Sequence, residues 1–283
     1  MRKGWRNFWI ACGVTAGVGA VLCCVGVGMG ATFDAVRARF PNGIGFVDHG
    51  GYESDYFEGA AVVTEEVFAG INKIDVEVTG VYLEVMESDD SSKVKMETTE
   101  IDSRLKFRYY QEGDELKLVT NNKNILGINN GSYGKITLYL PRHMMEEIDI
   151  SCGAGELYAE SLQAKELSID IGAGEGTINN FNATNVDINC GAGQITLNGC
   201  FEQDMEVECG IGEVQVSLDK AENYYNYDLE CGIGEIRLGE SIYSGISSER
   251  QIDNNAYREI RVECGIGEVR VDFNSHHDVH HEE

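Results

Sequence analysis

The chain has 283 residues, of which 34 are glycine and 2 are proline. Its 48 Asp and Glu against 22 Lys and Arg give a formal net charge of −26 at pH 7. Such acidity repels nucleic acid and anionic lipid headgroups, so we exclude a nucleic-acid partner and expect cations, basic proteins or neutral glycans. The charge also serves simple solubility. Abundant glycine without proline argues against a disordered linker and indicates tight turns at repeated positions.

The first predicted element is an uncharged apolar run over residues 8–33. As a helix it would reach about 39 Å, enough to cross a bilayer. Because Arg2, Lys3 and Arg6 precede it, the positive-inside rule places the N-terminus in the cytoplasm and the large domain outside the cell membrane. We therefore predict a single-pass protein that contacts the lipid bilayer through this helix. A signal peptide cleaved near residues 28–31 is the alternative.

The rest of the chain divides by composition. Residues 1–33 are the cytoplasmic basic tip and the anchor, 34–67 a stalk, 68–273 a β-rich domain and 274–283 a polar tail. Apolar and polar residues alternate over 74–85, which predicts an early rung of that domain. A strand or a short helix is expected at 62–68, further strands at 92–99, 104–111, 114–120 and 134–140, and a hairpin turn at 111–114.

A five-residue motif recurs six times from residue 152 onward. Successive copies are 19, 19, 19, 22 and 33 residues apart. Fixed periods of this length are typical of stacked repeats that bury a shared core. We predict an all-β, right-handed parallel β-helix or related solenoid with rungs of about 19 residues. The copies are Cys152-Gly153-Ala154-Gly155-Glu156, Ile171-Gly172-Ala173-Gly174-Glu175, Cys190-Gly191-Ala192-Gly193-Gln194, Cys209-Gly210-Ile211-Gly212-Glu213, Cys231-Gly232-Ile233-Gly234-Glu235 and Cys264-Gly265-Ile266-Gly267-Glu268.

Each copy is interpreted as a corner between two short strands. Alternation before the corner points one side of the strand inward, and a further inward column is predicted at Leu162, Phe181 and Cys200. We expect the corner to need a positive φ, which glycine adopts without steric cost. The predicted structural corners are Gly153, Gly155, Gly172, Gly174, Gly191, Gly193, Gly210, Gly212, Gly232, Gly234, Gly265 and Gly267.

Five of the nine cysteines take the same place in the repeat, directly before the corner. In-register parallel side chains lie about 4.8 Å apart and aim alike, whereas a disulfide needs Cβ atoms about 3.8 Å apart and facing each other. We therefore predict an inward column of free thiols, with disulfides or a metal as the alternative. The five are Cys152, Cys190, Cys209, Cys231 and Cys264.

Two polar columns flank the corners. Stacked carboxylates about 5 Å apart repel each other unless they are solvated or neutralised. We interpret both columns as solvated and predict no cofactor, although Glu213, Glu235 and Glu268 are candidates for weak Ca²⁺ binding. After the corners stand Glu156, Glu175, Gln194, Glu213, Glu235 and Glu268, and before them Ser151, Asp170, Asn189, Glu208, Glu230 and Glu263.

Catalytic patterns offer an alternative to this interpretation. Polysaccharide lyases and hydrolases on β-helices use exposed carboxylates beside Arg or Lys, and Arg237, Arg261 and Arg270 are the basic residues of the last two corner strands. The sequence contains neither a Ser/His/Asp order nor a P-loop. We predict no catalytic residues and no enzyme, with such a carbohydrate-active enzyme as the alternative.

Aromatic and histidine clusters lie outside the regular rungs. Tyr224, Tyr225, Tyr243 and Tyr257 form either an interaction surface or packing across the last rungs, and the pattern does not decide between them. The polar tail contains His276, His277, His280 and His281. These imidazoles are candidates for binding a transition metal, and a tail without fixed ligands is the alternative.

The whole layout resembles the bacterial "putative adhesin" domain-of-unknown-function family of exported or membrane-anchored proteins. The resemblance rests on the strand at 74–78, the strand ending at Pro141 and the six Gly-x-Gly copies, and it covers residues 68–273. It implies a noncatalytic domain, and some relatives accompany envelope-stress signalling. We therefore expect an extracytoplasmic interaction, adhesion or stress-sensing module whose partner is an envelope protein or a glycan.

Overall fold

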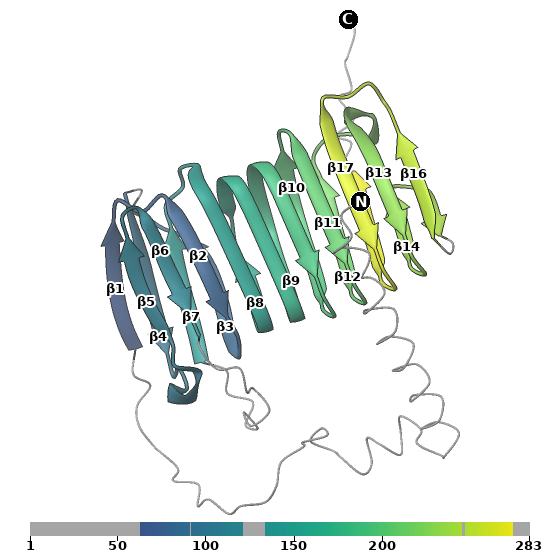
Figure 1. The fold of residues 1–283 in the computed structure, drawn as a ribbon. Coiled ribbons are helices and arrows are strands. Elements are labelled where there is room, and N and C mark those ends of the chain that lie inside the picture. The colour runs from purple at the N-terminus through teal and green to yellow at the C-terminus, as the bar shows by residue number, and fades with distance from the viewer. Residues whose placement is uncertain (1–62, 91, 121–133, 245–246, 274–283) are drawn as a thin grey trace, which may run out of the picture. The chain divides into compact units, whose positions relative to one another are not determined.

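The computed structural model describes residues 63–90, 92–120, 134–244 and 247–273 (Figure 1). Within these ranges the chain is an all-β solenoid of eighteen strands with two single-turn 3-10 helices, Ser103–Leu105 and Glu222–Tyr224. No helix among the described residues is long and apolar enough to cross a membrane. The predicted anchor (1–33), most of the predicted stalk (34–67) and the predicted tail (274–283) lie outside the described residues.

Each rung contributes one strand before its corner and one after it, so the strands form two faces. The pre-corner face contains, in spatial order, β5 (Arg108–Glu112), β6 (Glu115–Val119), β2 (Lys73–Val78), the first part of β8 (Met145–Ala159), two runs of β9 (Leu162–Cys190), β11 (Asp204–Cys209), β17 (Arg258–Cys264), β13 (Tyr225–Cys231) and β16 (Ser248–Ile252). The post-corner face contains β1 (Val63–Ala69), β4 (Lys93–Thr99), β7 (Gly134–Leu140), β3 (Val81–Glu87), the remaining parts of β8 and β9, β10 (Gln194–Phe201), β12 (Glu213–Leu218), β18 (Glu268–Phe273), β14 (Glu235–Leu238) and β15 (Ser241–Ser244).

The core lies between the two faces, where the inward side chains of successive rungs stack in register. Ile150, for example, lies between Val76 and Ile169, and all three are buried. Burying one such side chain stabilises the fold by about 1.5–3 kcal/mol, so the stack gains stability with every added rung. The predicted all-β solenoid is therefore confirmed.

Antiparallel strands cover both ends of the parallel stack. At one end β5 pairs with β6 and β4 pairs with β7, and at the other β16 pairs with β13 and β15 with β14. Two of these pairs, β5–β6 and β14–β15, are hairpins whose two-residue turns begin at Gly113 and Gly239, both with positive φ. An uncovered parallel edge would offer unpaired backbone groups to another chain, and these antiparallel strands end the parallel stack instead.

The last rungs do not stack in chain order. The rung formed by β17 and β18 lies between the rung of β11 and β12 and the rung of β13 and β14. Figure 1 shows β17 between β11 and β13. In chain order, the outer rung of β13 and β14 and the antiparallel strands that cover it, β15 and β16, therefore come first. The strands β17 and β18 follow and form the rung beneath them.

The reason for the corner glycines differs from the prediction. Positive φ was expected at every corner, but among the twelve corner glycines only Gly155 has one. A Cβ on Gly172, Gly191 or Gly210 would instead lie 2.5–2.6 Å from the carbonyl oxygen of the glycine one rung below. Close approach of successive rungs therefore selects glycine at most of these corners, because any side chain would force the rungs apart.

Local irregularities of the backbone change two assignments that were made from the sequence. The register slips between Leu197 and Gly199, so Phe201 is buried and Cys200 is only half-buried beside Asn182. Gly199 thus lies opposite Phe181, in the place that had been assigned to Cys200, and Phe201 is buried opposite Ala183. The strand expected at 104–111 begins only at β5, because the 3-10 turn and a left-handed Lys106 precede it. The segment at 62–68 is strand β1 and not a helix.

Candidate functional site

The six corners stack into one edge of the solenoid, which we call the corner edge. Its middle residues follow one another in space as Ala154, Ala173, Ala192, Ile211, Ile266 and Ile233, because backbone amides of each corner donate to the corner below. Ile266 N donates to Gly210 O at 2.8 Å, and Ile233 N donates to Gly265 O at 2.7 Å. The first three corners therefore present alanine and the last three present isoleucine.

The last three corners share one sequence, Glu-Cys-Gly-Ile-Gly-Glu, at residues 208–213, 263–268 and 230–235. Their isoleucines lie on adjacent rungs and are 65%, 50% and 69% exposed for Ile211, Ile266 and Ile233. We call these three side chains the isoleucine strip. A surface depression follows it and is lined by the strip, by Ala192 and by polar residues of the following strands. The sequence pattern places these isoleucines in the corners and does not predict that they form a surface.

The carboxylate column after the corners is confirmed, and its spatial order is Glu156, Glu175, Gln194, Glu213, Glu268 and Glu235. Arginines neutralise its last two members. Arg237 pairs with Glu235 and with Glu268, whose Oε1 lies 3.3 Å from Arg237 Nε, and Arg270 Nη2 lies 3.5 Å from the same Oε1. The electrostatic repulsion expected in this column is therefore relieved at its outer end.

The row before the last three corners, Glu208, Glu263 and Glu230, has no such relief. None of the three forms an ion pair within the described part of the chain. Burial raises the pKa of Glu208 and of Glu263, and neighbouring glutamates raise both further. Arg261 lies nearby but directs its guanidinium to Glu206, Asp228 and Glu259.

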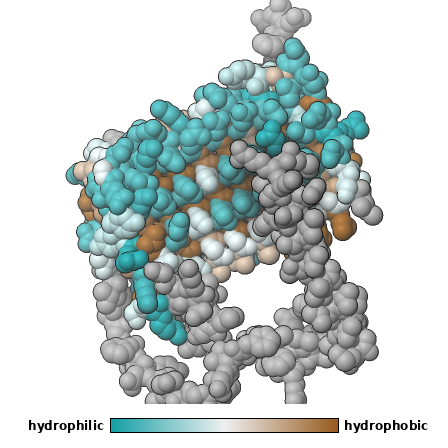
Figure 2. All heavy atoms as spheres, viewed as in Figure 1, coloured by the Kyte–Doolittle hydropathy of each residue, from teal (hydrophilic) through white to brown (hydrophobic). Residues whose placement is uncertain are grey.

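At the opposite end of the pre-corner face, lysines match the acidic side chains. Lys117 Nζ lies 3.1 Å from Asp75 and 3.3 Å from Glu115, and Lys73 Nζ lies 3.0 Å from Glu147. Their acidic partners raise the pKa of both lysines. Figure 2 shows hydrophilic residues over much of the face in view, with narrower areas of hydrophobic residues between them.

A carboxylate cluster forms at a place that sequence reasoning did not select. Oxygen atoms of Glu206, Glu208 and Glu263 lie within 4.8 Å of one another, and this is the one group of potential metal ligands among the described residues. The predicted Ca²⁺ candidates Glu213, Glu235 and Glu268 do not form such a group. Glu206 and Glu263 meet only because β17 inserts beside β11. The histidines His276, His277, His280 and His281 lie outside the described residues.

The comparisons with known proteins identify the family. The chain matches the Toastrack DUF4097 family over residues 71–217 and again over 154–272. The chain belongs to the Toastrack DUF4097 family. This membership confirms the resemblance to adhesin-type domains of unknown function, and residues 71–272 are called the Toastrack domain below.

Solved structures with related folds are distant in sequence. A "putative cell adhesion protein" from Clostridium sporogenes is 14% identical, covering 75% of this chain and 100% of that chain, with a TM-score of 0.47. A "putative lipid binding protein" from Parabacteroides distasonis is 17% identical, covering 75% and 97%, with a TM-score of 0.42. A search of curated proteins finds no match. At TM-scores below 0.5 these similarities do not bear on function.

The cysteine column of the Toastrack domain is an internal packing feature. Cys152, Cys190, Cys209, Cys264 and Cys231 are buried, free and in register, with Ile171 in the remaining place. Hydrogen bonding among neighbouring thiols raises the pKa of Cys209 and lowers those of Cys190 and Cys264 to about 7. Burial raises the pKa of Cys152 to about 11.

Cysteine and glycine depend on each other at the corners. A Cβ on Gly212 would lie 2.8 Å from Cys190 Sγ, and one on Gly267 would lie 2.8 Å from Cys209 Sγ. The sulfur of one rung therefore fills the space that the second glycine of the next rung leaves free. The predicted inward column of buried cysteines without disulfides is confirmed by this packing.

The predicted aromatic surface divides into two parts. Tyr225 is fully buried and stacks on Phe201, with ring centroids 5.3 Å apart, so of the two alternatives packing across the last rungs holds for this residue. Burial raises its pKa to about 12. Tyr224 and Tyr257 are exposed, and Tyr243 is half-buried with Arg250 5.5 Å from its ring centroid. The exposed tyrosines are not grouped into one patch by any contact between them.

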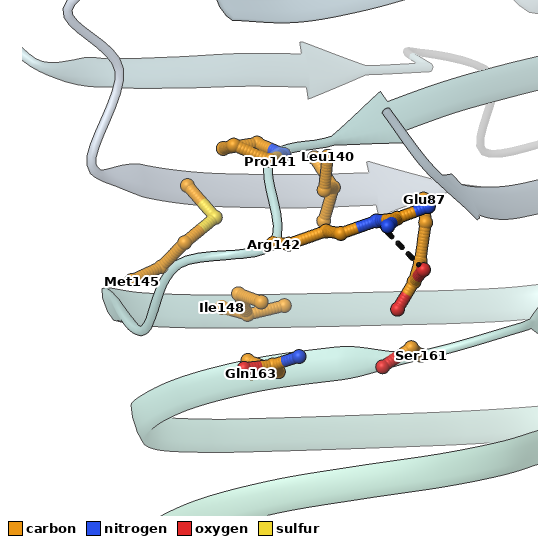
Figure 3. A pocket seen from close by; sticks show the side chains of 8 residues that line it. All are labelled: Glu87, Leu140, Pro141, Arg142, Met145, Ile148, Ser161 and Gln163. Carbon is orange, nitrogen blue, oxygen red and sulfur yellow. Dashed lines mark ion pairs between the residues drawn. The ribbon is translucent and has the colours of Figure 1, made fainter. Parts of the chain in front are cut away.

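A second pocket lies where β7 passes to β8 (Figure 3). Leu140, Met145 and Ile148 line its inner side, and Arg142 Nε lies 3.0 Å from Glu87 Oε2. Its volume of about 10 Å³ holds one water molecule at most. This pocket is a packing defect beside Pro141 and not a ligand site.

Proposed function

We propose that this chain is a membrane-anchored, noncatalytic interaction module on the outer side of the cell membrane, acting in adhesion or envelope-stress sensing. The observation that supports it is the corner edge of the last three rungs, where exposed apolar side chains lie between two rows of glutamates. Side chains so exposed contribute little to the core, whereas an apolar strip within a polar rim is the usual composition of a binding surface.

The placement outside the membrane rests on the apolar run over residues 8–33 and the basic residues before it. It is tested by adding protease to intact cells that express the full chain. We expect the protease to remove the acidic domain and to leave the N-terminus protected. Protection of the entire chain would reject this placement.

Binding is tested with the full chain in phosphatidylcholine nanodiscs and an isolated envelope fraction. We expect salt-sensitive retention of envelope material, because glutamate rows attract basic partners over a Debye length of about 8–10 Å. Treating the envelope fraction with protease beforehand separates protein partners from glycans. Retention equal to that of empty nanodiscs would reject the binding function.

The alternative is a carbohydrate-active enzyme, and the cluster of Glu206, Glu208 and Glu263 beside Arg261 favours it. Glycosidases separate their two carboxyl groups by about 5–9.5 Å, and the oxygens of this cluster approach more closely than that. The same envelope fraction distinguishes the two functions. New reducing or unsaturated sugar ends, lost in the variant Glu208→Gln, would establish the enzyme and overturn the noncatalytic proposal.

A further inference from the structure

The isoleucine strip has no role in building the corner. Ala154, Ala173 and Ala192 occupy the same place in the first three corners, and those corners have the same backbone pairing. An isoleucine that is 50–69% exposed leaves most of its apolar surface in water. Because three of them lie on successive rungs, they form one continuous apolar surface, which is a feature of interaction sites.

The negative charge around the strip restricts which surfaces can bind there. Glu208, Glu263 and Glu230 lie on one side of it and Glu213, Glu268 and Glu235 on the other. Of these six, only Glu235 and Glu268 form an ion pair with an arginine within the described residues. Anionic lipid would be repelled, whereas lysine or arginine side chains of a partner would supply the missing counter-charges.

The spacing of the strip selects a helix over a strand. Neighbouring rungs lie about 4.8 Å apart, so the three isoleucines span about 9.6 Å along the solenoid axis. Helix positions i, i+4 and i+7 advance about 10.5 Å in total, at 1.5 Å per residue. Alternate residues of a strand are about 6.7 Å apart, and three of them span about 13 Å. The helix matches the strip within about 1 Å and the strand misses it by about 4 Å.

We infer that the isoleucine strip binds a basic amphipathic helix of a partner protein, lying along the solenoid axis with lysine or arginine on both sides of its apolar stripe. The inference rests on the proposed binding function and specifies its partner. Ile211, Ile266 and Ile233 pack against the apolar stripe, and the two glutamate rows pair with the flanking cations. With only three apolar contacts we expect an affinity on the order of micromolar, as in transient complexes.

The test uses a fluorescein-labelled peptide of 14 residues with leucine at positions 4, 8 and 11 and lysine on both sides of that stripe. Its anisotropy is titrated with the full chain in phosphatidylcholine nanodiscs, and empty nanodiscs give the background. We expect the triple variant Ile211→Ala, Ile233→Ala, Ile266→Ala to bind at least 10-fold more weakly. Val67→Ala is the matched control, because Val67 on β1 is 54% exposed and remote from the strip.

Three outcomes of the peptide titration would overturn the inference. They are unchanged affinity in the triple variant, equal binding of a peptide with the same composition in scrambled order, and tighter binding of an alternating Leu-Lys strand peptide. The triple variant is expected to fold, because alanine stands at the same place in three corners, and circular dichroism checks this. If the triple variant retains envelope material as the wild type does, the strip inference fails while the proposed binding function stands.

Discussion

The first three and the last three corners share the same backbone pairing between rungs and differ in what they present to solvent. The first three have alanine at the tip, and their carboxylate columns are incomplete. Ser151 and Asn189 interrupt the column before the corners, and Gln194 interrupts the column after them. The last three have isoleucine at every tip and glutamate on both sides. Since the alanine corners stack equally well, the isoleucines and glutamates are dispensable for the fold. The comparison therefore separates the scaffold from the surface that it carries.

The largest expected effect concerns the scaffold. A Cβ on Gly210 would lie 2.6 Å from Gly191 O, whereas the nearest atom to one on Gly153 would be Thr79 Oγ1 at 3.3 Å. We expect Gly210→Ala to lower the free energy of unfolding by about 2–3 kcal/mol and Gly153→Ala to change it by less than about 0.5 kcal/mol. Urea denaturation of the full chain measures both. Equal losses would show that close rung approach does not select glycine.

The difference between Gly210 and Gly153 also shows which features can be predicted from the sequence alone. Period, alternation and the repeated Gly-x-Gly gave the corners, the cysteine column and both carboxylate columns, because each depends on residues at fixed offsets within a rung. The cause of the glycine requirement was missed, since it lies in the distance between rungs. No spacing within one rung reports that distance.

Other features depended on which rungs are neighbours. The 33-residue interval before Cys264 predicts an excursion but not that β17 returns beneath β13. For this reason the meeting of Glu206 with Glu263, and the adjacency of Ile211 with Ile266, could not be deduced. The register slip near Gly199 likewise moved Phe201 inward, and Tyr225 joined the core against it.

The cysteine column gives the next effect in size. Cys209 is 3% exposed within an apolar column, and Cys200 is half-buried beside Asn182 at the rim of its rung. We expect Cys209→Ser to cost about 1–2 kcal/mol, because a hydroxyl would replace a thiol among apolar neighbours, and Cys200→Ser less than about 0.5 kcal/mol. Thermal melts compare the two variants. A larger loss for Cys200→Ser would contradict the assignment of the column as core.

Carboxyl groups on the pre-corner face predict an unusual pH dependence. Burial raises the pKa of Asp170, Asp187, Glu208 and Glu263. A carboxyl with a raised folded-state pKa binds protons in the folded protein before the unfolded chain does, so stability increases as the pH falls from 7 towards about 4.5. We expect the melting temperature to rise over that interval.

The variant Glu263→Gln sharpens this test. It removes a carboxylate that lies between Glu208 and Glu230, so the melting temperature at pH 7 should increase and its pH dependence should weaken. The change is small and decreases with added salt, because the row is partly exposed. Ser151→Ala, which removes no charge from the corresponding place in the first corner, should leave the pH dependence intact. A lower melting temperature in Glu263→Gln at pH 7 would argue against repulsion in this row.

The smallest effect concerns the boundary between the two sets of corners. Ala192 is the last alanine and lies one rung from Ile211. We expect Ala192→Ile to extend the strip and to tighten binding of the helical peptide about 3-fold, while Ala154→Ile, two rungs further away, leaves the affinity unchanged. Fluorescence anisotropy measures both. Equal tightening by the two variants would indicate that any added apolar side chain on the edge attracts the peptide.

The out-of-order stacking of the final rung has a consequence for the order of assembly during synthesis. The rung of β13 and β14, residues 225–238, pairs with β17 and β18 on its inner side. The rung of β11 and β12 pairs with the other side of these same two strands. A nascent chain synthesised only as far as Tyr257 therefore contains the rung of β11 and β12 and the rung of β13 and β14, but it lacks the rung of β17 and β18 that pairs with both. The last 16 residues through Phe273 complete the interior, so a chain that ends before them loses its inner layer while still containing its outer one.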